Sequence, residues 1–464
     1  MSRTFTSVNP ARPTEVVGEF TAASVADVSA AVEAAARAQL DWAERTPAQR
    51  ATLVAGVAHA LARQTPELTE LITREEGKTL SDSAGEVRKS VEQFHFASQL
   101  CYQVEGTTYP SEQPGTFTYS LRSPVGVVVA ITPWNFPLSL PARKIAAALA
   151  AGNAVVFKPS PVTAAVGEAL VRTIRDAGLP DQLVQVVHGD DPAAMATLVG
   201  HHAVRAISLT GSDRVGEKVR EASHRHARLQ AELSGHNVSV VCADADLPAA
   251  AAEVVPGAFG LSGQACTAAS RVLVDRAVLA GFTELLAARV RALTCGPGDA
   301  PGVDCGPLAT VAQFERVDGL ARAARRDGTV LAEGELRDDR DPEGYYLAPL
   351  LVGGLGADHT VNATETFGPI LSVLPVNGLD EALDVVNRDD YGLASAIHTT
   401  SLGTAQRFAR EVRCGVVKVN QRTTGNGIAA PFGGWKASSS GAFPEGGAQA
   451  LDFFTETKTV YCRG

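Results

Sequence analysis

Apolar and polar residues follow a helical period over the first hundred residues of the chain. From Val25 to about Cys101, Ala, Leu, Glu and Arg recur three to four positions apart, as in VADVSAAVEAAARAQLDWAERTP. This spacing predicts a layer of amphipathic helices. Further along, the apolar runs VGVVVAIT, NAVVFKP, LVQVVHG and AVRAISLTGS alternate with helical segments, predicted at about 141–149 and 166–176. Such alternation predicts a doubly wound, mostly parallel sheet, and therefore the α/β fold class.

A second set of apolar runs follows the midpoint of the chain. These are VSVVCADA, SRVLVD, ILSVLPV, LASAIHTT and GVVKVN, and they predict a second α/β unit. We expect one unit from residues 1–106 and 123–233 and the other from residues 234–436. Two such units with a cleft between them suit a cofactor and a substrate.

Two segments outside these units look extended. EGTTYPSEQPGTFTYSLR, from Glu105 to Arg122, and the C-terminal FFTETKTVYCRG carry alternating Thr, Tyr and Phe. Residues of these types favour pairing with another strand, including one of a neighbouring subunit. We therefore assign residues 107–122 and 447–464 to a small β arm.

Composition and charge narrow the class of protein. The 464 residues include 45% hydrophobic and 20% charged residues, which is a globular composition. A formal net charge of −10 gives no general attraction to nucleic acid or to an anionic membrane. No run approaches the roughly 20 apolar residues that span a bilayer, and the first residues do not resemble a signal peptide. We expect a cytoplasmic protein.

The cysteines and histidines do not suggest a metal site. Seven scattered cysteines show neither C-x-x-C nor the Cys/His spacing of zinc ligands, so we interpret them as reduced thiols. Four histidines are interpreted as solvated: His201, His202, His224 and His226. We therefore expect no bound metal.

Three residues could carry acyl chemistry together. Cys266 lies in FGLSGQACTAASRVLV, Glu232 in LQAELSGHN and Asn135 in ITPWNFP. Alone, such a cysteine is usually a small buried hydrophobe, such a carboxylate is usually solvated or paired, and such an asparagine is a turn residue. Together they supply a nucleophile, a base and a neutral donor for an oxyanion.

Seven motifs make the resemblance to a family specific. ITPWNFP, FKPS, SLTGS, AELSG, GQACT, ETFGP and PFGGWK stand in the order and approximate spacing of the aldehyde dehydrogenase superfamily, and the match spans essentially the whole chain. The resemblance implies a dinucleotide-binding domain, a catalytic domain and a small β oligomerisation arm. It also implies a homodimer or homotetramer that uses NAD or NADP.

The same resemblance implies the roles of individual residues. Cys266 would be the nucleophile and Glu232 the base that activates water. Asn135 and the backbone N–H of Cys266 would hold the oxyanion of a thiohemiacetal, which hydride transfer converts to a thioester. The positions implied for the cofactor are Thr132, Pro133, Trp134, Lys158, Ser160, Thr210, Gly211, Ser212, Val215, Leu233, Glu365 and Phe367.

The chain departs from the family pattern near the cofactor. NAD-preferring members often carry a Glu three residues after the lysine of FKPS, where this chain has Pro161. Without that carboxylate nothing repels a 2′-phosphate, so both NAD and NADP remain open. AELSGHN also replaces the commoner E-L-G-G-K-N with Ser234 and His236, and PFGGWKASSSG lacks the usual S-G-x-G-R-E.

The substrate is expected to be an anionic aldehyde. Arg143, eight residues after Asn135, resembles the arginine with which succinate semialdehyde dehydrogenases clamp the distal carboxylate. The alternative for this residue is an ion pair with a protein carboxylate. The C-terminal loop resembles that of α-ketoglutaric semialdehyde (2,5-dioxovalerate) dehydrogenases. The predicted substrate positions, for a carboxylate or a phosphonate, are Arg143, Thr267, Arg422, Thr423 and Phe432.

Two other functions compete with hydrolytic aldehyde oxidation. A CoA-acylating dehydrogenase would pass the acyl group to a thiol, as methylmalonate semialdehyde dehydrogenases do, but those typically lack the base, so Glu232 argues against it. The other alternative is a catalytically inactive structural member, and the retention of Cys266, Glu232 and Asn135 argues against that.

Overall fold

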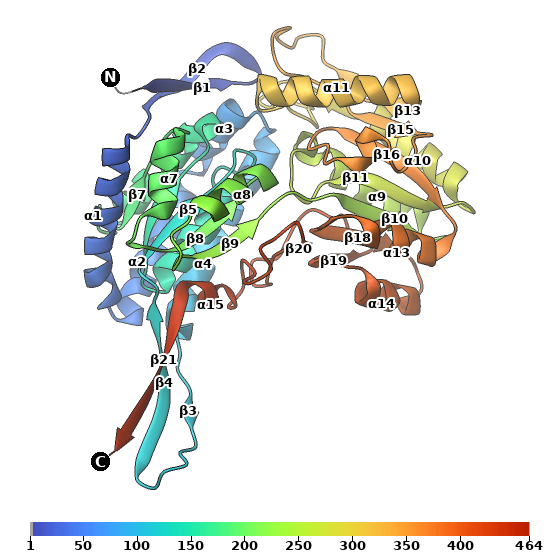
Figure 1. Ribbon diagram of the computed structural model, residues 1–464. Coiled ribbons are helices and arrows are strands. Elements are labelled where there is room, and N and C mark those ends of the chain that lie inside the picture. Colours follow the sequence, from blue (N-terminus) through green and yellow to red (C-terminus); the bar gives the residue numbers. More distant parts are fainter. Residues whose placement is uncertain (1–2, 464) are drawn as a thin grey trace.

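The structure is a computed structural model that describes residues 3–463 (Figure 1). Helices fill the N-terminal region, as the spacing predicted. The first two begin at capping boxes, Ser24 with Asp27 and Thr46 with Gln49, so their first amides are bonded locally. The helices are α1 (Val25–Ala43), α2 (Pro47–Arg63), α3 (Thr65–Glu76) and α4 (Leu80–Leu100).

A five-stranded parallel sheet forms the first α/β unit, in the order β7-β6-β5-β8-β9. Every residue of β5 is buried, as expected for a strand covered on both faces. The predicted alternation of strands and helices is confirmed. The strands are β5 (Val127–Ile131), β6 (Ala154–Lys158), β7 (Val184–Val186), β8 (Val204–Thr210) and β9 (Arg228–Glu232). The helices are α5 (Ser139–Ala150), α6 (Ala164–Asp176), α7 (Pro192–Gly200) and α8 (Asp213–Ala222).

A seven-stranded sheet forms the second unit, in the order β13-β15-β16-β11-β10-β18-β19, with only β13 antiparallel. The five apolar runs predicted for this unit are confirmed as strands. The strands are β10 (Asn237–Val241), β11 (Ala269–Asp275), β13 (Thr329–Glu333), β15 (Leu350–Gly353), β16 (Ile370–Val376), β18 (Ala394–His398) and β19 (Val416–Val419). The helices are α9 (Leu247–Phe259), α10 (Leu279–Arg291), α11 (Val311–Asp327), α12 (Thr360–Ala363), α13 (Gly378–Arg388) and α14 (Leu402–Glu411).

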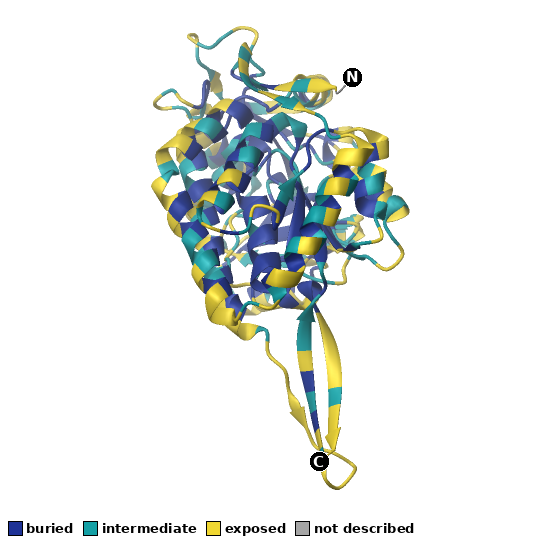
Figure 2. Ribbon diagram, turned by 90° about the vertical axis from the view of Figure 1, so that its left-hand side faces the viewer, coloured by how far each residue is buried: buried dark blue, intermediate teal, exposed yellow. Residues whose placement is uncertain are grey.

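The two extended segments form one antiparallel arm that projects from the body (Figures 1 and 2). In the arm, β4 (Thr116–Pro124) pairs with β21 (Thr455–Arg463) on one side and with β3 (Thr108–Tyr109) on the other. The expected strand pairing is confirmed within the chain. The arm starts later than residue 447, because α15 (Ala450–Phe454) buries Phe453 and Phe454 in the first core.

The N-terminal hairpin was not predicted. It consists of β1 (Thr4–Asn9) and β2 (Arg12–Thr21), and Ala11 at its turn is buried in the core of the second unit. Buried, half-buried and exposed residues follow one another irregularly in both strands, so the sequence shows no clear alternation of apolar and polar residues there. The remaining short strands are β12 (Thr294–Cys295), β14 (Glu335–Leu336), β17 (Tyr391–Gly392) and β20 (Trp435–Lys436).

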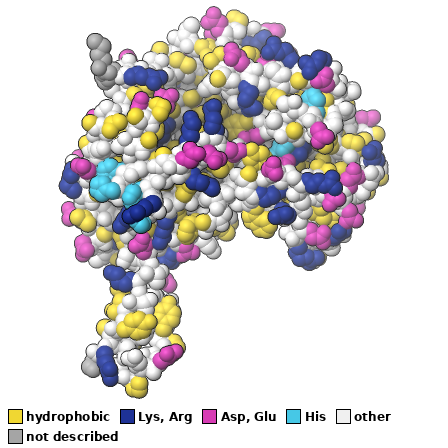
Figure 3. Space-filling view, viewed as in Figure 1, with side chains coloured by type: hydrophobic (Ala, Val, Ile, Leu, Met, Phe, Trp, Pro, Cys, Tyr) yellow, Lys and Arg dark blue, Asp and Glu magenta, His cyan; other side chains and the backbone are white. Residues whose placement is uncertain are grey.

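The chain crosses between the two sheets within a few residues. Strand β9 ends at Glu232 and β10 begins at Asn237, and each sheet has its own apolar core. The surface is hollowed between the two units (Figure 3). Within residues 3–463, no helix combines the length and the apolar character that crossing a membrane requires.

Candidate active site

A strained turn positions Cys266. Helix α9 is followed by Leu261, Ser262 and Gly263, which have φ angles of 56°, 56° and 70°. Two successive non-glycine residues in the left-handed region are rare, and such strain is found at sites that the surrounding structure holds firmly. Here the Ser262 hydroxyl donates to the Gly306 carbonyl at 2.8 Å. The turn brings Cys266 to the amino end of β11.

Cys266 lies where two cavities meet. One cavity, of about 300 Å³, is lined by Asn135, Glu365 and Cys266 among others. The other, of about 330 Å³, is lined by Glu232 and again by Cys266. The half-buried thiol can therefore be approached from two sides, and the other two candidate catalytic residues, Asn135 and Glu232, line the cavities on either side of it.

The thiol is not ionised in this state of the protein. Burial raises the pKa of Cys266 to about 12, and the nearby carboxyl group of Glu365 raises it further, while Arg143 opposes the shift. Because a thiolate is the nucleophilic form, attack by Cys266 requires a group that accepts the proton.

Glu232, the candidate base, is held by the C-terminal loop. Its Oε2 accepts the N–H of Gly434 at 3.0 Å and its Oε1 accepts the Ser439 hydroxyl at 2.9 Å. A side chain at Gly433 would lie 3.1 Å from Oε1, so the glycine leaves room for the carboxyl group. Burial raises the pKa of Glu232 to about 8, and the charge of Glu445 adds to the shift. At neutral pH this group therefore holds its proton.

Asn135 is fixed through both its side chain and its backbone. Its Nδ2 donates to the Gln264 carbonyl at 2.9 Å, directly beside the candidate nucleophile. Its own carbonyl accepts Lys78 Nζ at 2.6 Å. Lys78 is buried and pairs with Glu86 at 2.8 Å, so the asparagine loop is tied to α4 by a buried ion pair. No sequence motif identified Lys78 or Glu86.

The cavity of about 300 Å³ contains most of the predicted cofactor residues. It extends to the start of α8, where no side chain caps the first amides of the helix, and such a terminus attracts phosphate. The lining residues that had been predicted are Pro133, Trp134, Thr210, Gly211, Ser212, Leu233, Glu365 and Phe367. The lining residues that had not been singled out for the cofactor are Ser234, Gln313 and Arg316.

Lys158 and Thr210 carry two further polar groups that bear on cofactor binding. The Nζ of Lys158 donates to the Pro159 carbonyl at 3.1 Å, and burial lowers the pKa of the lysine to about 8. The buried hydroxyl of Thr210, by contrast, has no partner among the described residues. Such groups fit ribose hydroxyls and phosphate oxygens. Four predicted cofactor positions lie outside the lining of the cavity: Thr132, Lys158, Ser160 and Val215.

Glu365 and Phe367 are placed by residues of α11. Arg316 donates to the Thr366 carbonyl at 2.5 Å and Gln313 to the Phe367 carbonyl at 2.6 Å. Phe367 adopts a left-handed φ of 45°. Glu365 accepts the N–H of Gly235 at 3.1 Å, and burial raises the pKa of its carboxyl group to about 7.

Two of the predicted substrate residues are placed differently from expectation. Arg422 lines the second cavity, but its guanidinium is paired with Glu253 at 2.9 Å. The side chain of Thr423 is fully buried and does not line the cavity, whereas its neighbour Thr424 does. The prediction that Thr423 contacts the anion is therefore wrong. Arg422 lines the cavity as predicted, but its charge is already neutralised by Glu253. Thr267 does line the cavity.

Arg143 lines the substrate cavity and also has a protein partner. Its guanidinium lies 4.9 Å from the centre of the Phe432 ring, and 3.4 Å separates it from Glu445. Glu445 is shared, because it also bonds the buried Lys144. The backbones of Phe432 and Glu445 exchange two hydrogen bonds, which fixes both residues. The alternative expected for Arg143, an ion pair with a protein carboxylate, is thus present in part.

The unusual His236 belongs to a buried ion network. Its Nδ1 lies 2.7 Å from Asp389, which also accepts Arg271 at 2.6 Å. Hydrogen bonding and the charges of these partners hold the pKa of Asp389 well below its usual range. The network joins the AELSGHN segment to the second sheet. No cluster of three or more potential metal ligands occurs among residues 3–463.

Comparison with known proteins identifies the family. Residues 1–460 match the model described as "Aldehyde dehydrogenase family". The chain is 39% identical, over 98% of its length and 94% of the relative, to alpha-ketoglutarate semialdehyde dehydrogenase of Haloferax volcanii. The chain therefore belongs to the aldehyde dehydrogenase family, and its activity is the NAD(P)-dependent oxidation of an aldehyde.

Solved structures agree with this assignment. Betaine aldehyde dehydrogenase from Staphylococcus aureus in complex with NAD⁺ superimposes with a TM-score of 0.94 at 28% identity, covering 99% of this chain and 92% of that one. A 3,6-anhydro-L-galactose dehydrogenase in complex with NADP gives a TM-score of 0.95 at 32% identity, covering 99% and 96%. The predicted fold and the choice of NAD or NADP as cofactor are confirmed.

Proposed function

We propose that the protein oxidises an aldehyde bearing a carboxylate through a thioester on Cys266. The observation that carries this proposal is the position of the thiol between two cavities. One cavity offers an uncapped helix terminus and the buried, unpartnered hydroxyl of Thr210, which suit a dinucleotide. The other holds a carboxyl group, Glu232, and the guanidinium of Arg143.

In the first step the sulfur of Cys266 attacks the aldehyde carbon while its proton moves to the Glu232 carboxylate. A C–S bond forms, and the carbonyl oxygen takes the electron pair of the broken π bond. The backbone N–H of Cys266 and the side-chain amide of Asn135 donate to this oxyanion. Gln264 accepts one of the two amide hydrogens of Asn135, which leaves the other for the oxyanion.

The second half of the reaction releases the acid. NAD(P), held by the groove, would supply the hydride acceptor that converts the thiohemiacetal to a thioester on Cys266. The Glu232 carboxylate, having passed its proton to solvent, then takes a proton from water as the water oxygen attacks the thioester carbon. Collapse of the adduct breaks the C–S bond and releases the acid, and the proton that Glu232 took from water passes to the sulfur to restore the thiol.

Family resemblance and position together assign the cofactor-holding residues. We assign Lys158 to the adenosine ribose, and Gly211 and Ser212 with the start of α8 to the pyrophosphate. Glu365 and Phe367 would hold the nicotinamide ribose and ring. The shared groove and its local hydrogen bonds support the assignment of Gly211, Ser212, Glu365 and Phe367, whereas that of Lys158 rests on the family resemblance. Because Pro161 supplies no carboxylate, this assignment accommodates a 2′-phosphate as well as a free hydroxyl.

The proposed substrate is a short semialdehyde with a terminal carboxylate. The relative from Haloferax volcanii is named for α-ketoglutarate semialdehyde. In this chain, Arg143 lines the cavity beside Cys266 and shares its only carboxylate partner among the described residues with Lys144. A guanidinium matches a carboxylate in bidentate fashion, so the cavity suits this class of aldehyde.

A panel of aldehydes tests this substrate class. Wild type and Arg143→Ala would be assayed with 2,5-dioxopentanoate, succinate semialdehyde, phosphonoacetaldehyde, pentanal and benzaldehyde, each with NAD and NADP. Loss of a charge-assisted hydrogen bond should lower kcat/KM for the carboxylated aldehydes by roughly tenfold to a hundredfold and leave the neutral ones nearly unchanged. If neutral aldehydes are preferred and Arg143→Ala changes nothing, the anionic-substrate proposal is refuted.

The CoA-acylating alternative is less well supported. Glu232 lines the same cavity as Cys266, where it can activate water. Product analysis with and without coenzyme A separates the two routes. Acid should form at the same rate in both reactions, and acyl-CoA that forms faster than the acid would favour the alternative.

We also propose that the arm joins subunits in a homodimer or homotetramer. Strand β21 lies at the edge of the arm sheet, with its outer edge unpaired within residues 3–463. Large hydrophobic side chains are exposed on the arm (Figure 3). They are Tyr109, Phe117, Leu121 and Tyr461. An unpaired edge with exposed aromatic residues suits the arm of a second copy of the chain.

A further inference from the structure

A second cation lines the substrate cavity beside Arg143. Lys89 lies on α4, and its half-buried side chain faces the cavity that also contains Cys266. It is one turn beyond Glu86 and one turn before Gln93, so the three residues share one face of the helix. No motif singled out Lys89, because α4 reads as an ordinary amphipathic helix in the sequence.

Lys89 has no carboxylate partner. Its Nζ donates to the carbonyl of Asn426 at 3.1 Å, and among residues 3–463 no carboxylate oxygen lies within 4.0 Å of it. Glu86, on the same face, is engaged by Lys78 and by two backbone amides at the start of α5. Two other acidic residues lie on this part of α4: Glu92 is exposed, and Asp82, which lines the same cavity, accepts the hydroxyl of Thr79 and has a pKa that burial raises. Among residues 3–463, the ammonium group of Lys89 is therefore in direct contact with no carboxylate.

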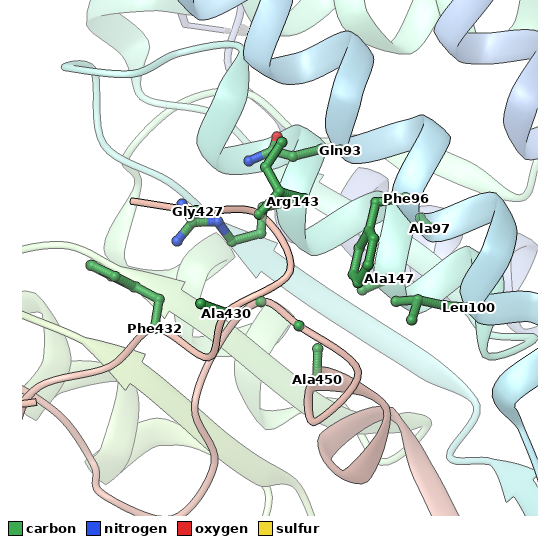
Figure 4. Close-up of a pocket in the computed structure, with 13 residues that line it drawn as sticks. Gln93, Phe96, Ala97, Leu100, Arg143, Ala147, Gly427, Ala430, Phe432 and Ala450 are labelled. Atoms are coloured by element: carbon green, nitrogen blue, oxygen red, sulfur yellow. The ribbon is translucent and has the colours of Figure 1, made fainter. Parts of the chain in front are cut away.

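The neighbouring cations are not alternatives to Lys89 as a second contact for an anion. Arg422 is neutralised by Glu253. Arg143 and Lys144 share the single carboxylate of Glu445, so one positive charge of that pair is uncompensated, and Lys89 adds a second. Figure 4 shows Arg143 reaching from its helix into the space between Gln93 and the loop that carries Phe432.

Lys89 has no paired carboxylate and Arg143 only shares one with Lys144, so keeping both cations partly buried is costly unless an anion joins them. Burial and the positive charge of Arg143 lower the pKa of Lys89 to about 8, which means that the charged form is disfavoured at this position. A bound carboxylate would favour the charged form of both groups and would restore the pKa of the lysine. The cavity is thus electrostatically incomplete without an anionic ligand.

We infer that Lys89 and Arg143 together hold the carboxylate at the far end of the substrate, and that Lys89 is a specificity-determining residue. This inference rests on the proposed oxidation of a carboxylated aldehyde and names a further residue for it. The two cations approach the carboxylate from different helices, α4 and α5, so they fix its position as well as its charge. The reacting aldehyde would then lie at Cys266, which lines the same cavity.

Two aldehydes that differ only at the far end test the inference. These are 5-oxopentanoate, which has a terminal carboxylate, and pentanal, which has a methyl group there. Lys89→Met should raise KM for 5-oxopentanoate by about tenfold or more, the loss expected for one charge-assisted contact, with little change in kcat. KM for pentanal should stay the same or fall. Lys89→Arg, which keeps the charge, should recover most of the affinity.

A matched control and the wild-type result separate the possible outcomes. Arg88→Met removes a cation from the exposed neighbouring position of α4 and should leave both aldehydes unaffected. If wild type prefers pentanal, the proposed function itself fails. If wild type prefers 5-oxopentanoate and Arg143→Ala weakens it, while Lys89→Met leaves its KM unchanged, only the inference about Lys89 is overturned. Equal losses for both aldehydes in Lys89→Met would also overturn it, since they would indicate a structural effect.

Discussion

At the residue scale, the two groups that exchange a proton in the proposed reaction are both buried. Burial raises the pKa of Glu232 to about 8 and that of Cys266 to about 12. The carboxylate is the active form of a base, so at neutral pH only a minority of molecules hold Glu232 ready for catalysis. Removal of that proton is therefore a condition for turnover.

The pH dependence of turnover follows from this. With saturating aldehyde and cofactor, kcat should rise by about tenfold per pH unit below pH 8 and level off above it, because the raised pKa of Glu232 keeps the protonated form dominant at lower pH. Steady-state rates between pH 6 and 9 measure this. The residual rate of Glu232→Gln, whose side chain does not titrate, should lack the rise. A wild-type rate that is flat or falls over this range would exclude Glu232 as the base.

Single residues were predictable from sequence when a motif contained them, and not when a distant partner decided their role. Cys266 and Asn135 stand in recognisable motifs and lie at one cavity. Arg422 looked equally suitable for an anion, but Glu253 on α9 neutralises it. Nothing in the local sequence indicates that partner, since 169 residues separate the two. Lys89 was missed for the converse reason, because its lack of a partner appears only in three dimensions.

At the scale of elements, strands buried on both faces were the most readable features. Runs such as VGVVVAIT and NAVVFKP became β5 and β6 because continuous apolar sequence suits a covered parallel strand. The hairpin of β1 and β2 lacks such runs and escaped prediction. The boundary near residue 447 was misplaced because Phe453 and Phe454 belong to a short buried helix and not to the arm. Aromatic residues suit a short buried helix as well as a strand of the arm, so the sequence could not distinguish the two.

At the scale of the whole molecule, the candidate active site depends on segments far apart in the chain. Glu232 is bonded by Gly434 and Ser439, which belong to a loop about 200 residues later in the chain. The order of motifs identified the fold, but periodicity alone could not show that this loop closes over the end of β9. Long-range placement of this kind comes from the packing of two separate sheets.

The arm makes a prediction about assembly. Phe117→Asp and Tyr461→Asp together would place charges on its exposed hydrophobic side chains, which are 56% and 73% exposed in the single chain. If the arm joins subunits, the double variant should have a lower molar mass than wild type in light scattering after gel filtration. Its thermal unfolding should confirm that the subunit remains folded. An unchanged molar mass, or a monomeric wild type, would contradict the proposed role of the arm.

The mass of the protein during turnover tests the thioester on Cys266 most directly. Wild type mixed with NAD(P) and 5-oxopentanoate and quenched during turnover should carry an acyl group, whereas Glu232→Gln should form NAD(P)H only slowly, because its amide accepts a proton neither from the thiol nor from water. Mass spectrometry should find the acyl group on the peptide that contains Cys266, and Cys266→Ala should show neither NAD(P)H formation nor adduct. Steady NAD(P)H production without any acylated peptide, or an adduct on another residue, would contradict the account.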